Sequence, residues 1–478
     1  MKIPFGPWTP DQPTLTSSAV AKNCIPYAQA YGPLHSLSSF STALGSASAC
    51  FGFVTAKQSN GTIHNHAGTA TRLEALSSTN TWDNVSKVGN YTGATSWEWA
   101  RTGNRLIAVD GAVPVQYYDM GTSTDYADLT GSPPAAYHIA AVRNFIVLGN
   151  VDDGTEYPDR LVWSGYNSSI LWTPARATQS DRRDLGGDGG KIQRVVPGQI
   201  GIVFQERSIW MMSYVGPPTI FSLNEIEPGR GTLAPNSVCW SGGVIYYLGL
   251  DGFYRFDGRS SPIGTERVDR WFFNTVDQTA LDETRGAIDP KNKLVLWTFK
   301  SSGGLAYFDR ILIYNWAADK WSYGEIDTEV VGSYAPPGYT LDSLDAIVPD
   351  IDAATVSFDS DIYQGGTIAL MAVGSDHKAS TFSGTALTAE IETVEMGESQ
   401  RVSVSARPLV NGGTVTLANG TRNIQTDNYT LSLYKSPNAI GLANFRTSAR
   451  YHRIRCKIAG GFDQAIGVDA EVVQQGYR

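Results

Sequence analysis

The chain has 478 residues and a formal net charge of −9, and 17% of its residues are charged while 42% are hydrophobic. That hydrophobic content allows a large core and excludes a chain that is disordered throughout. The acidic balance excludes a basic surface that holds nucleic acid along its length, although nucleic acid could still slide through a neutral or acidic passage.

Residues 1–45 are predicted to form an extended arm. Prolines are spread through this segment, and proline cannot join the interior of a sheet ladder. We expect the arm to dock on a partner, because it carries Phe5, Trp8 and Tyr31 without a core of its own. The segment lacks the apolar stretch of a signal peptide, and no run of about 18 apolar residues follows, so we expect synthesis in the cytosol and no membrane span.

Residues 46–395 are predicted to form a β-propeller. Several short strands recur in each unit, and the aromatic residues that close successive units lie about 44 to 49 residues apart, at Trp82, Tyr126, Trp172 and Phe221. This period is typical of propeller blades and predicts six or seven of them. Segments 363–366, 368–373 and 380–384 are candidates for a final blade.

Residues 396–478 show a different pattern. Apolar and polar residues alternate over 401–410, 414–417, 451–458 and 467–473, as in strands with one buried face. These segments predict a small antiparallel β-sandwich. Because helical periodicity is nearly absent from the whole chain, the predicted fold class is all-β.

The sequence offers few residues for catalysis or for a cofactor. His64 and His66 have no third ligand near them, and the four cysteines are scattered without a CxxC pair. Five carboxylates could serve a glycoside hydrolase, but nothing in the sequence pairs any two of them; they are Glu98, Asp119, Glu206, Asp251 and Glu266. Neither a sialidase-type turn nor a G-x-S-x-G elbow is present. We therefore expect a protein that is not an enzyme and has no metal or cofactor.

Candidate interface residues lie in three places. Arg182 and Arg183 belong to a mixed Arg–Asp segment that is either a surface loop or a contact across a subunit boundary. A basic stripe near the C-terminus touches phosphates, forms a solvated face or makes salt bridges to a neighbour. The candidates are Phe5, Trp8 and Tyr31 in the arm, Arg182 and Arg183, and Arg450, Arg453 and Arg455 in the stripe.

Short motifs in three parts of the chain carry a resemblance to a known family. The opening has WTPDQP at 8–13, AKNCIP at 21–26 and YGPL at 31–34; the middle has YHIAAVRNFIVLGN at 137–150 and RLVWS at 160–164; the close has ARYHRIR at 449–455 and AIGV at 465–468. Together they resemble the tail hub, or nozzle (tail accessory), proteins of short-tailed bacteriophages, and the resemblance spans nearly the whole chain. Relatives of the pattern also occur in long-tailed phages and gene-transfer particles.

The resemblance implies a structural virion protein that is assembled in the host cytoplasm. It implies a β-propeller subunit, six copies of which form a ring below the portal and adaptor proteins and carry distal tail or fibre proteins. Double-stranded DNA would pass through the lumen during ejection without sequence-specific binding. Two alternatives stay open: a carbohydrate-active propeller, hydrolase or lectin, on a virion or secreted, and a protein-binding propeller inside a cell.

Overall fold

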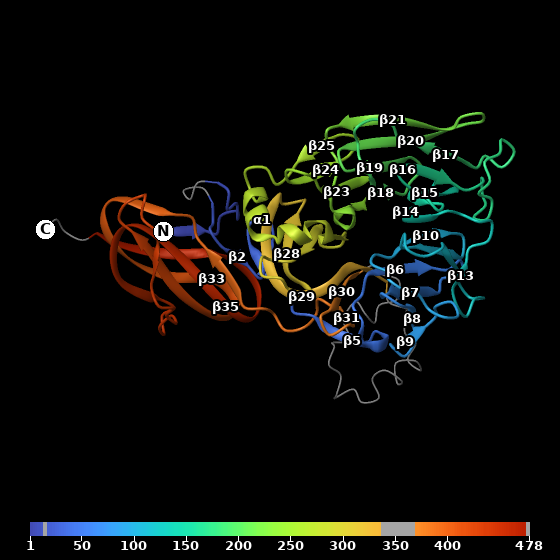
Figure 1. Cartoon of the computed structure of the whole chain (residues 1–478). Coiled ribbons are helices and arrows are strands. Elements are labelled where there is room, and N and C mark those ends of the chain that lie inside the picture. Colours follow the sequence, from blue (N-terminus) through green and yellow to red (C-terminus); the bar gives the residue numbers. More distant parts are fainter. Residues whose placement is uncertain (13–16, 336–368, 475–478) are drawn as a thin grey trace.

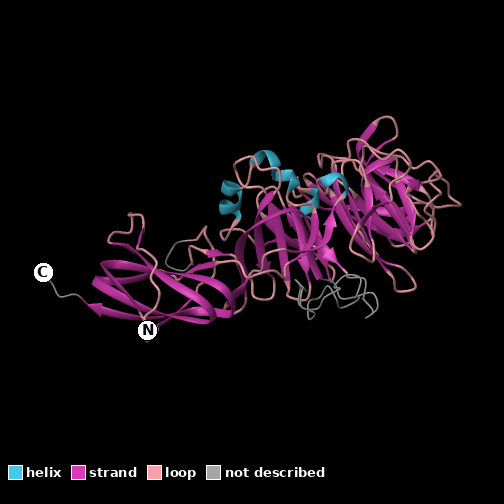
Figure 2. Cartoon of the chain, turned by 90° about the horizontal axis from the view of Figure 1, so that it is seen from below, coloured by secondary structure: helices cyan, strands magenta, loops and turns pink. Residues whose placement is uncertain are grey.

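The computed structural model describes residues 1–12, 17–335 and 369–474, and the regular secondary structure in these ranges is almost entirely β-strand (Figure 2). The prediction of an all-β fold is confirmed. In the described residues there is one α-helix, α1 (Asp269–Thr275), with 3-10 turns η1 (Gly45–Ala47), η2 (Pro235–Ser237) and η3 (Gln278–Glu283). Figure 1 shows a rounded lobe of blades and, beside it, an elongated lobe that holds β33, β35 and the N-terminus.

Five separate four-stranded antiparallel sheets form blades of a propeller. The first contains β6 (Gly52–Lys57), β7 (Ile63–Gly68), β8 (Leu73–Leu76) and β9 (Trp82–Asn84), and the second β10 (Glu98–Thr102), β11 (Arg105–Val109), β12 (Gln116–Asp119) and β13 (Ala127–Asp128). The third contains β14 (Ala135–Val142), β15 (Phe145–Asp152), β16 (Glu156–Trp163) and β17 (Asp181–Asp184). The fourth contains β18 (Ile192–Val196), β19 (Gly201–Gln205), β20 (Ser208–Gly216) and β21 (Ile220–Pro228), and the fifth β22 (Cys239–Ser241), β23 (Val244–Leu248), β24 (Phe253–Phe256) and β25 (Ser260–Pro262).

The aromatic residues of the sequence repeat fill the spaces between blades. Tyr126 belongs to the core between the first and second blades, Trp172 to the next core, and Phe221 to the core between the third and fourth. Trp82 packs against the core that joins the first blade to the strands that close the ring. The repeat is therefore a packing requirement, since each blade needs a large side chain to fill the gap to its neighbour.

The strands that follow the fifth blade belong to a 15-stranded curled sheet. It includes β26 (Arg285–Asp289), β27 (Leu294–Phe299), β28 (Phe308–Asn315), β29 (Lys320–Tyr334), β30 (Ala369–Gly374), β31 (Lys378–Thr381) and β5 (Ser38–Ala43). The first half of β29 pairs with β28, while its second half pairs with β30, and β31 pairs in turn with β5 from the arm. β26, β29 and β6 lie side by side, so this sheet fills the space between the fifth and first blades.

The predicted blade count is corrected accordingly. The described residues contain five separate four-stranded blades where six or seven were expected, because β29 joins the remaining strands into one continuous sheet. Of the segments predicted for a final blade, 363–366 lies outside the described residues, while β30 and β31 correspond to the other two.

The elongated lobe is an extension of the same sheet. It contains β32 (Ala389–Glu392), β33 (Met396–Arg422), β34 (Thr430–Leu431) and β35 (Ala443–Gln474), and β33 pairs with β35 along its length with repeated register shifts. Ile454, Cys456 and Ile458 are fully buried on one face of β35, as the alternation predicts. The predicted sandwich is not confirmed, because these strands form one curled sheet that is continuous with β29.

The N-terminal arm is tied into this lobe. It contains β1 (Lys2–Pro4), β2 (Ala21–Lys22), β3 (Cys24–Pro26) and β4 (Tyr31–Pro33). β1 pairs with β35, β2 lies between β29 and β32, and β4 meets β35 at Ala465. The domain bounds 1–45, 46–395 and 396–478 remain a prediction.

The arm also caps helix α1. The Asp11 carboxylate accepts hydrogen bonds from the backbone N–H groups of Arg270 (2.7 Å) and Trp271 (2.9 Å). These are donors that the first turn of a helix leaves without an intrahelical partner. Asp269, at the first position of α1, is buried nearby and accepts a hydrogen bond from Phe253 N at 3.1 Å.

Candidate functional site

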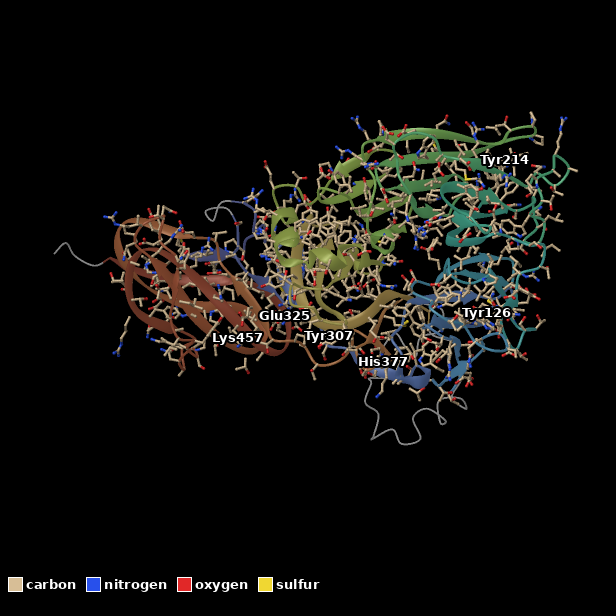
Figure 3. All side chains as sticks on the ribbon, in the orientation of Figure 1. Tyr126, Tyr214, Tyr307, Glu325, His377 and Lys457 are labelled. Atoms are coloured by element: carbon tan, nitrogen blue, oxygen red, sulfur yellow. The ribbon has the colours of Figure 1, made fainter. Side chains whose placement is uncertain are left out.

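Two cavities lie where the first strands of the blades converge. One, of about 260 Å³, is lined by residues of β6, β10, β18, β22, β26 and β29. The other, of about 570 Å³, is lined mainly by residues at or just before the starts of these strands, and also by Lys300 and Tyr307, the latter labelled in Figure 3. Arg285 and Asn236 line both cavities, so they stand between them. We call this pair of cavities the axial site.

A buried carboxylate organises the charged groups of the axial site. Glu98, in β10, accepts a hydrogen bond from Ile139 N at 3.3 Å, lies 2.9 Å from His138 Nδ1 and forms an ion pair with Arg194 Nη1. Burial raises the pKa of Glu98, but Arg194 and His138 oppose it and the pKa is lowered overall. Glu98 is thus held as a carboxylate with its lone pairs already occupied.

Arg285 is the second guanidinium of the axial site. It begins β26, is half-buried, and its Nη2 donates to the carbonyl oxygen of Phe51 at 3.2 Å. Within the described ranges no carboxylate oxygen lies within 4.0 Å of its nitrogen atoms. Burial lowers the pKa of Arg285, as expected for a cation removed from water. The neighbouring Lys300, by contrast, is paired with Glu283 at 2.6 Å.

The predicted interface residues of the arm lie inside the chain. Phe5, Trp8 and Tyr31 are 5%, 1% and 0% exposed, and the Tyr31 hydroxyl donates to the carbonyl of Gly6 at 2.9 Å. Trp8 packs with its ring centroid 4.8 Å from that of Trp271 and 4.9 Å from that of Tyr323. The expectation that these aromatics face a partner is therefore corrected, because the apolar surface that covers them is supplied by the same chain.

The predicted arginines are separated from one another. Arg182 and Arg183 are exposed on β17, the last strand of the third blade, and Arg450 is exposed on β35. Arg453 is 3% exposed, and its guanidinium lies 4.7 Å from the ring centroid of Tyr429. The prediction of Arg453 as an interface residue is therefore corrected, because its side chain is buried. Arg455 pairs with Glu392 at 3.1 Å. The three arginines of β35 therefore do not form a continuous basic surface for phosphates.

The other sequence candidates are held by structural contacts. The Tyr126 hydroxyl lies 3.3 Å from His66 Nδ1, and burial lowers the pKa of His66 to about 3. Asp119 forms two hydrogen bonds with Arg105, each 2.7 Å long. Over residues 1–12, 17–335 and 369–474, no group of three or more His, Cys, Asp or Glu side chains is placed to hold a metal ion. The same ranges contain no helix long and apolar enough to cross a membrane.

Sequence reasoning did not assemble the axial site. Glu98 was considered as a hydrolase carboxylate, but its partners His138, Arg194 and Arg285 lie on three other blades or sheets. What these residues share is a position in the first strand of a four-stranded blade or, for Arg285, in the first strand after the fifth blade. A charged residue recurring there is the pattern that could have indicated them, because first strands face the axis of a propeller.

Comparisons with known proteins show only a distant likeness in fold. No family model matches the chain, and a search of curated proteins finds no match. Among solved structures the chain is similar to selenomethionine-substituted virginiamycin B lyase from Staphylococcus aureus, at 9% identity and a TM-score of 0.43, over 71% of this chain and 96% of that one.

Proposed function

We propose that this chain is a structural, non-enzymatic subunit of a ring-shaped tail hub in a short-tailed bacteriophage. The observation that carries the proposal is the pairing of the two chain ends. The opening and closing motifs of the family resemblance meet in one lobe, where β1 pairs with β35 and Tyr31 lies opposite Ala465. Because motifs from both ends of the chain build this one lobe, they support a role for the lobe in assembly.

Exposed apolar side chains on the elongated lobe give this role a physical basis. Ile424, Leu433, Ile440 and Val473 are 60%, 86%, 68% and 62% exposed. β34, which follows Ile424, is an edge strand of the large sheet, and unpaired sheet edges bearing apolar side chains favour association with another chain. We propose that this surface contacts a neighbouring copy or an adjoining portal, adaptor or fibre protein.

The path for DNA in this proposal is the ring of copies and not the axis of one propeller. Glu98, Arg194 and Arg285 line the axial site. Glu98 and Arg194 form an ion pair, and Arg285 donates a hydrogen bond to Phe51 O, so these side chains are held in place. A net charge of −9 suits a wall past which phosphates slide without binding. The lumen would then be bounded by outer surfaces of the subunits.

The curled sheet has a place in the same proposal. We infer that the curled sheet closes the propeller, with β26–β28 and the first half of β29 on the side of the fifth blade and the second half of β29 with β30, β31 and β5 on the side of the first blade. The lateral contacts of β29 with β26 and β6 support this assignment. A ring closed in this way gives the rigid scaffold that a tail conduit needs.

The proposal is tested by the mass and location of the protein. Six copies of the 51.7 kDa chain have a mass of about 310 kDa, which light scattering or native mass spectrometry distinguishes from a monomer. Leu433→Glu is expected to prevent ring formation, whereas Val88→Glu, at a fully exposed propeller residue, should leave it intact.

Absence of the protein from purified phage particles would refute the proposal. Turnover of a glycoside that is abolished by one carboxylate substitution would favour the carbohydrate-active alternative instead.

A further inference from the structure

We propose that Arg285, together with Arg194 and Asn236, forms a binding site on the propeller axis for a small molecule bearing a carboxylate or phosphate group. This inference rests on the axial site alone and does not depend on the assembly proposed above.

The charges that line the smaller cavity do not balance. The charged side chains that line the smaller cavity are Glu98, Arg194 and Arg285. Glu98 is engaged by Arg194, His138 and Ile139 N, which leaves Arg285 without a carboxylate partner within the described ranges. A guanidinium removed from water is costly unless an anion compensates it. The smaller cavity therefore carries one positive charge in excess, and a bound oxyanion would neutralise it.

The same cavity is lined by hydrogen-bond donors that the described residues do not use. A guanidinium has five N–H donors, and one contact of Arg285, to Phe51 O, is found in the described part of the chain. Arg194 Nε is buried and has no hydrogen-bond partner there. Asn236 lies 3.4 Å from Arg194 through its Oδ1 and 3.4 Å from Ser96 Oγ through its Nδ2, both at the long limit for a hydrogen bond. These donors come from β18, β26 and η2 and surround one space, in the forked arrangement that suits carboxylates and phosphates.

The larger cavity leaves room for the rest of the ligand. It has a volume of about 570 Å³ and opens on the other side of Arg285 and Asn236. Its polar lining includes His138, Lys300 and Tyr307 and the carboxylates of Asp282, Glu283 and Glu329, of which Glu283 is paired with Lys300. A cavity of this size lies within the range of small-molecule sites. The bound anion would contact Arg285 while its uncharged part occupies the larger cavity. A sugar acid and a nucleoside monophosphate both meet this description, and the shared feature is the oxyanion.

The test is titration calorimetry at low ionic strength with four probes: inorganic phosphate, acetate, glucuronate and adenosine monophosphate. We expect wild-type protein to bind at least one of them, and glucuronate and the nucleotide distinguish a carboxylate source from a phosphate source. Arg285→Gln should weaken that binding roughly tenfold or more, because it removes the charge and the fork. Arg255→Gln, at an exposed arginine of β24 paired with Asp257, is the matched control and should bind as wild type.

A second variant keeps the test decisive if Arg285→Gln fails to fold. Arg285→Lys retains the charge but loses the forked geometry, so its affinity should lie between those of wild type and the glutamine variant. Failure of wild-type protein to bind any of the four probes, or equal binding by Arg285→Gln and wild type, would overturn the proposal.

Discussion

Replacing Asp269 with Asn is expected to remove much of the pH dependence of the stability of this protein. Asp269 is 7% exposed at the start of α1. Burial, reinforced by the nearby carboxylates of Asp11 and Asp251, raises its pKa from 3.8 to about 7 although Phe253 N donates to it. The folded state therefore holds a proton on Asp269 over a pH range in which the unfolded chain has lost it.

The direction and size of the change in the free energy of unfolding follow from this difference in proton affinity. Because the folded-state pKa is raised, the stabilising contribution is complete below pH 4 and is lost as the pH rises through about 7. A tenfold difference in proton affinity corresponds to about 1.4 kcal/mol, so the loss in the free energy of unfolding is about 4 kcal/mol at most. Asn cannot ionise but can still accept the hydrogen bond from Phe253 N, so the variant should gain stability relative to wild type as the pH rises.

The assay is urea denaturation of both proteins at pH 5, 6, 7 and 8. The stability of Asp269→Asn minus that of wild type should increase from pH 5 to pH 7 and level off towards pH 8. Asp153→Asn, at an exposed loop residue, should show no such trend. A difference between Asp269→Asn and wild type that stays constant from pH 5 to pH 8 would refute the reasoning.

Three further predictions concern the arm and the thiols. Trp8→Ala removes an indole packed between Trp271 and Tyr323 and should lower the free energy of unfolding by about 3–5 kcal/mol. In the same denaturation assay, Val88→Ala at a fully exposed site should change it by less than about 0.5 kcal/mol. Asp11→Ala should cost about 1 kcal/mol by uncapping α1, and Asp11→Asn should retain part of that because one acceptor oxygen remains; equal losses would contradict the cap. All four cysteines are buried: Cys24, Cys50, Cys239 and Cys456. Burial raises the pKa of Cys50 to about 12, so a thiol reagent should label the chain only after unfolding. Rapid labelling of native protein would show that this burial is incomplete.

The propeller could be predicted because its repeat is local. Tyr126, Trp172 and Phe221 recur once per unit since each fills one gap between blades, and that requirement leaves a period in the sequence. The blade count could not be predicted, because β29 is one uninterrupted strand whose two halves pair with different neighbours. Nothing in its own residues marks where one partner ends and the next begins.

The partners of the arm and of the axial site were missed for a related reason. The sequence indicated that Trp8 and Tyr31 need an apolar surface to cover them, and both side chains are covered in the structure. The local sequence pattern does not distinguish a covering surface of the same chain from that of a partner protein. Glu98, His138 and Arg194 are brought together because the first strands of three blades converge, and no spacing in the sequence expresses that convergence.

The pairing of β5 with β31 sets a condition on how the chain reaches its native state. Ser39 and Ser380, whose hydroxyls lie 3.1 Å apart, are separated by 341 positions, so the ring cannot close until the ribosome has delivered most of the chain. Until then β5 stays unpaired, and the nascent propeller presents an open sheet edge that is prone to self-association. A chain stopped before residue 378 should remain open and be cleaved by a protease within 38–43, a cut that the completed ring resists.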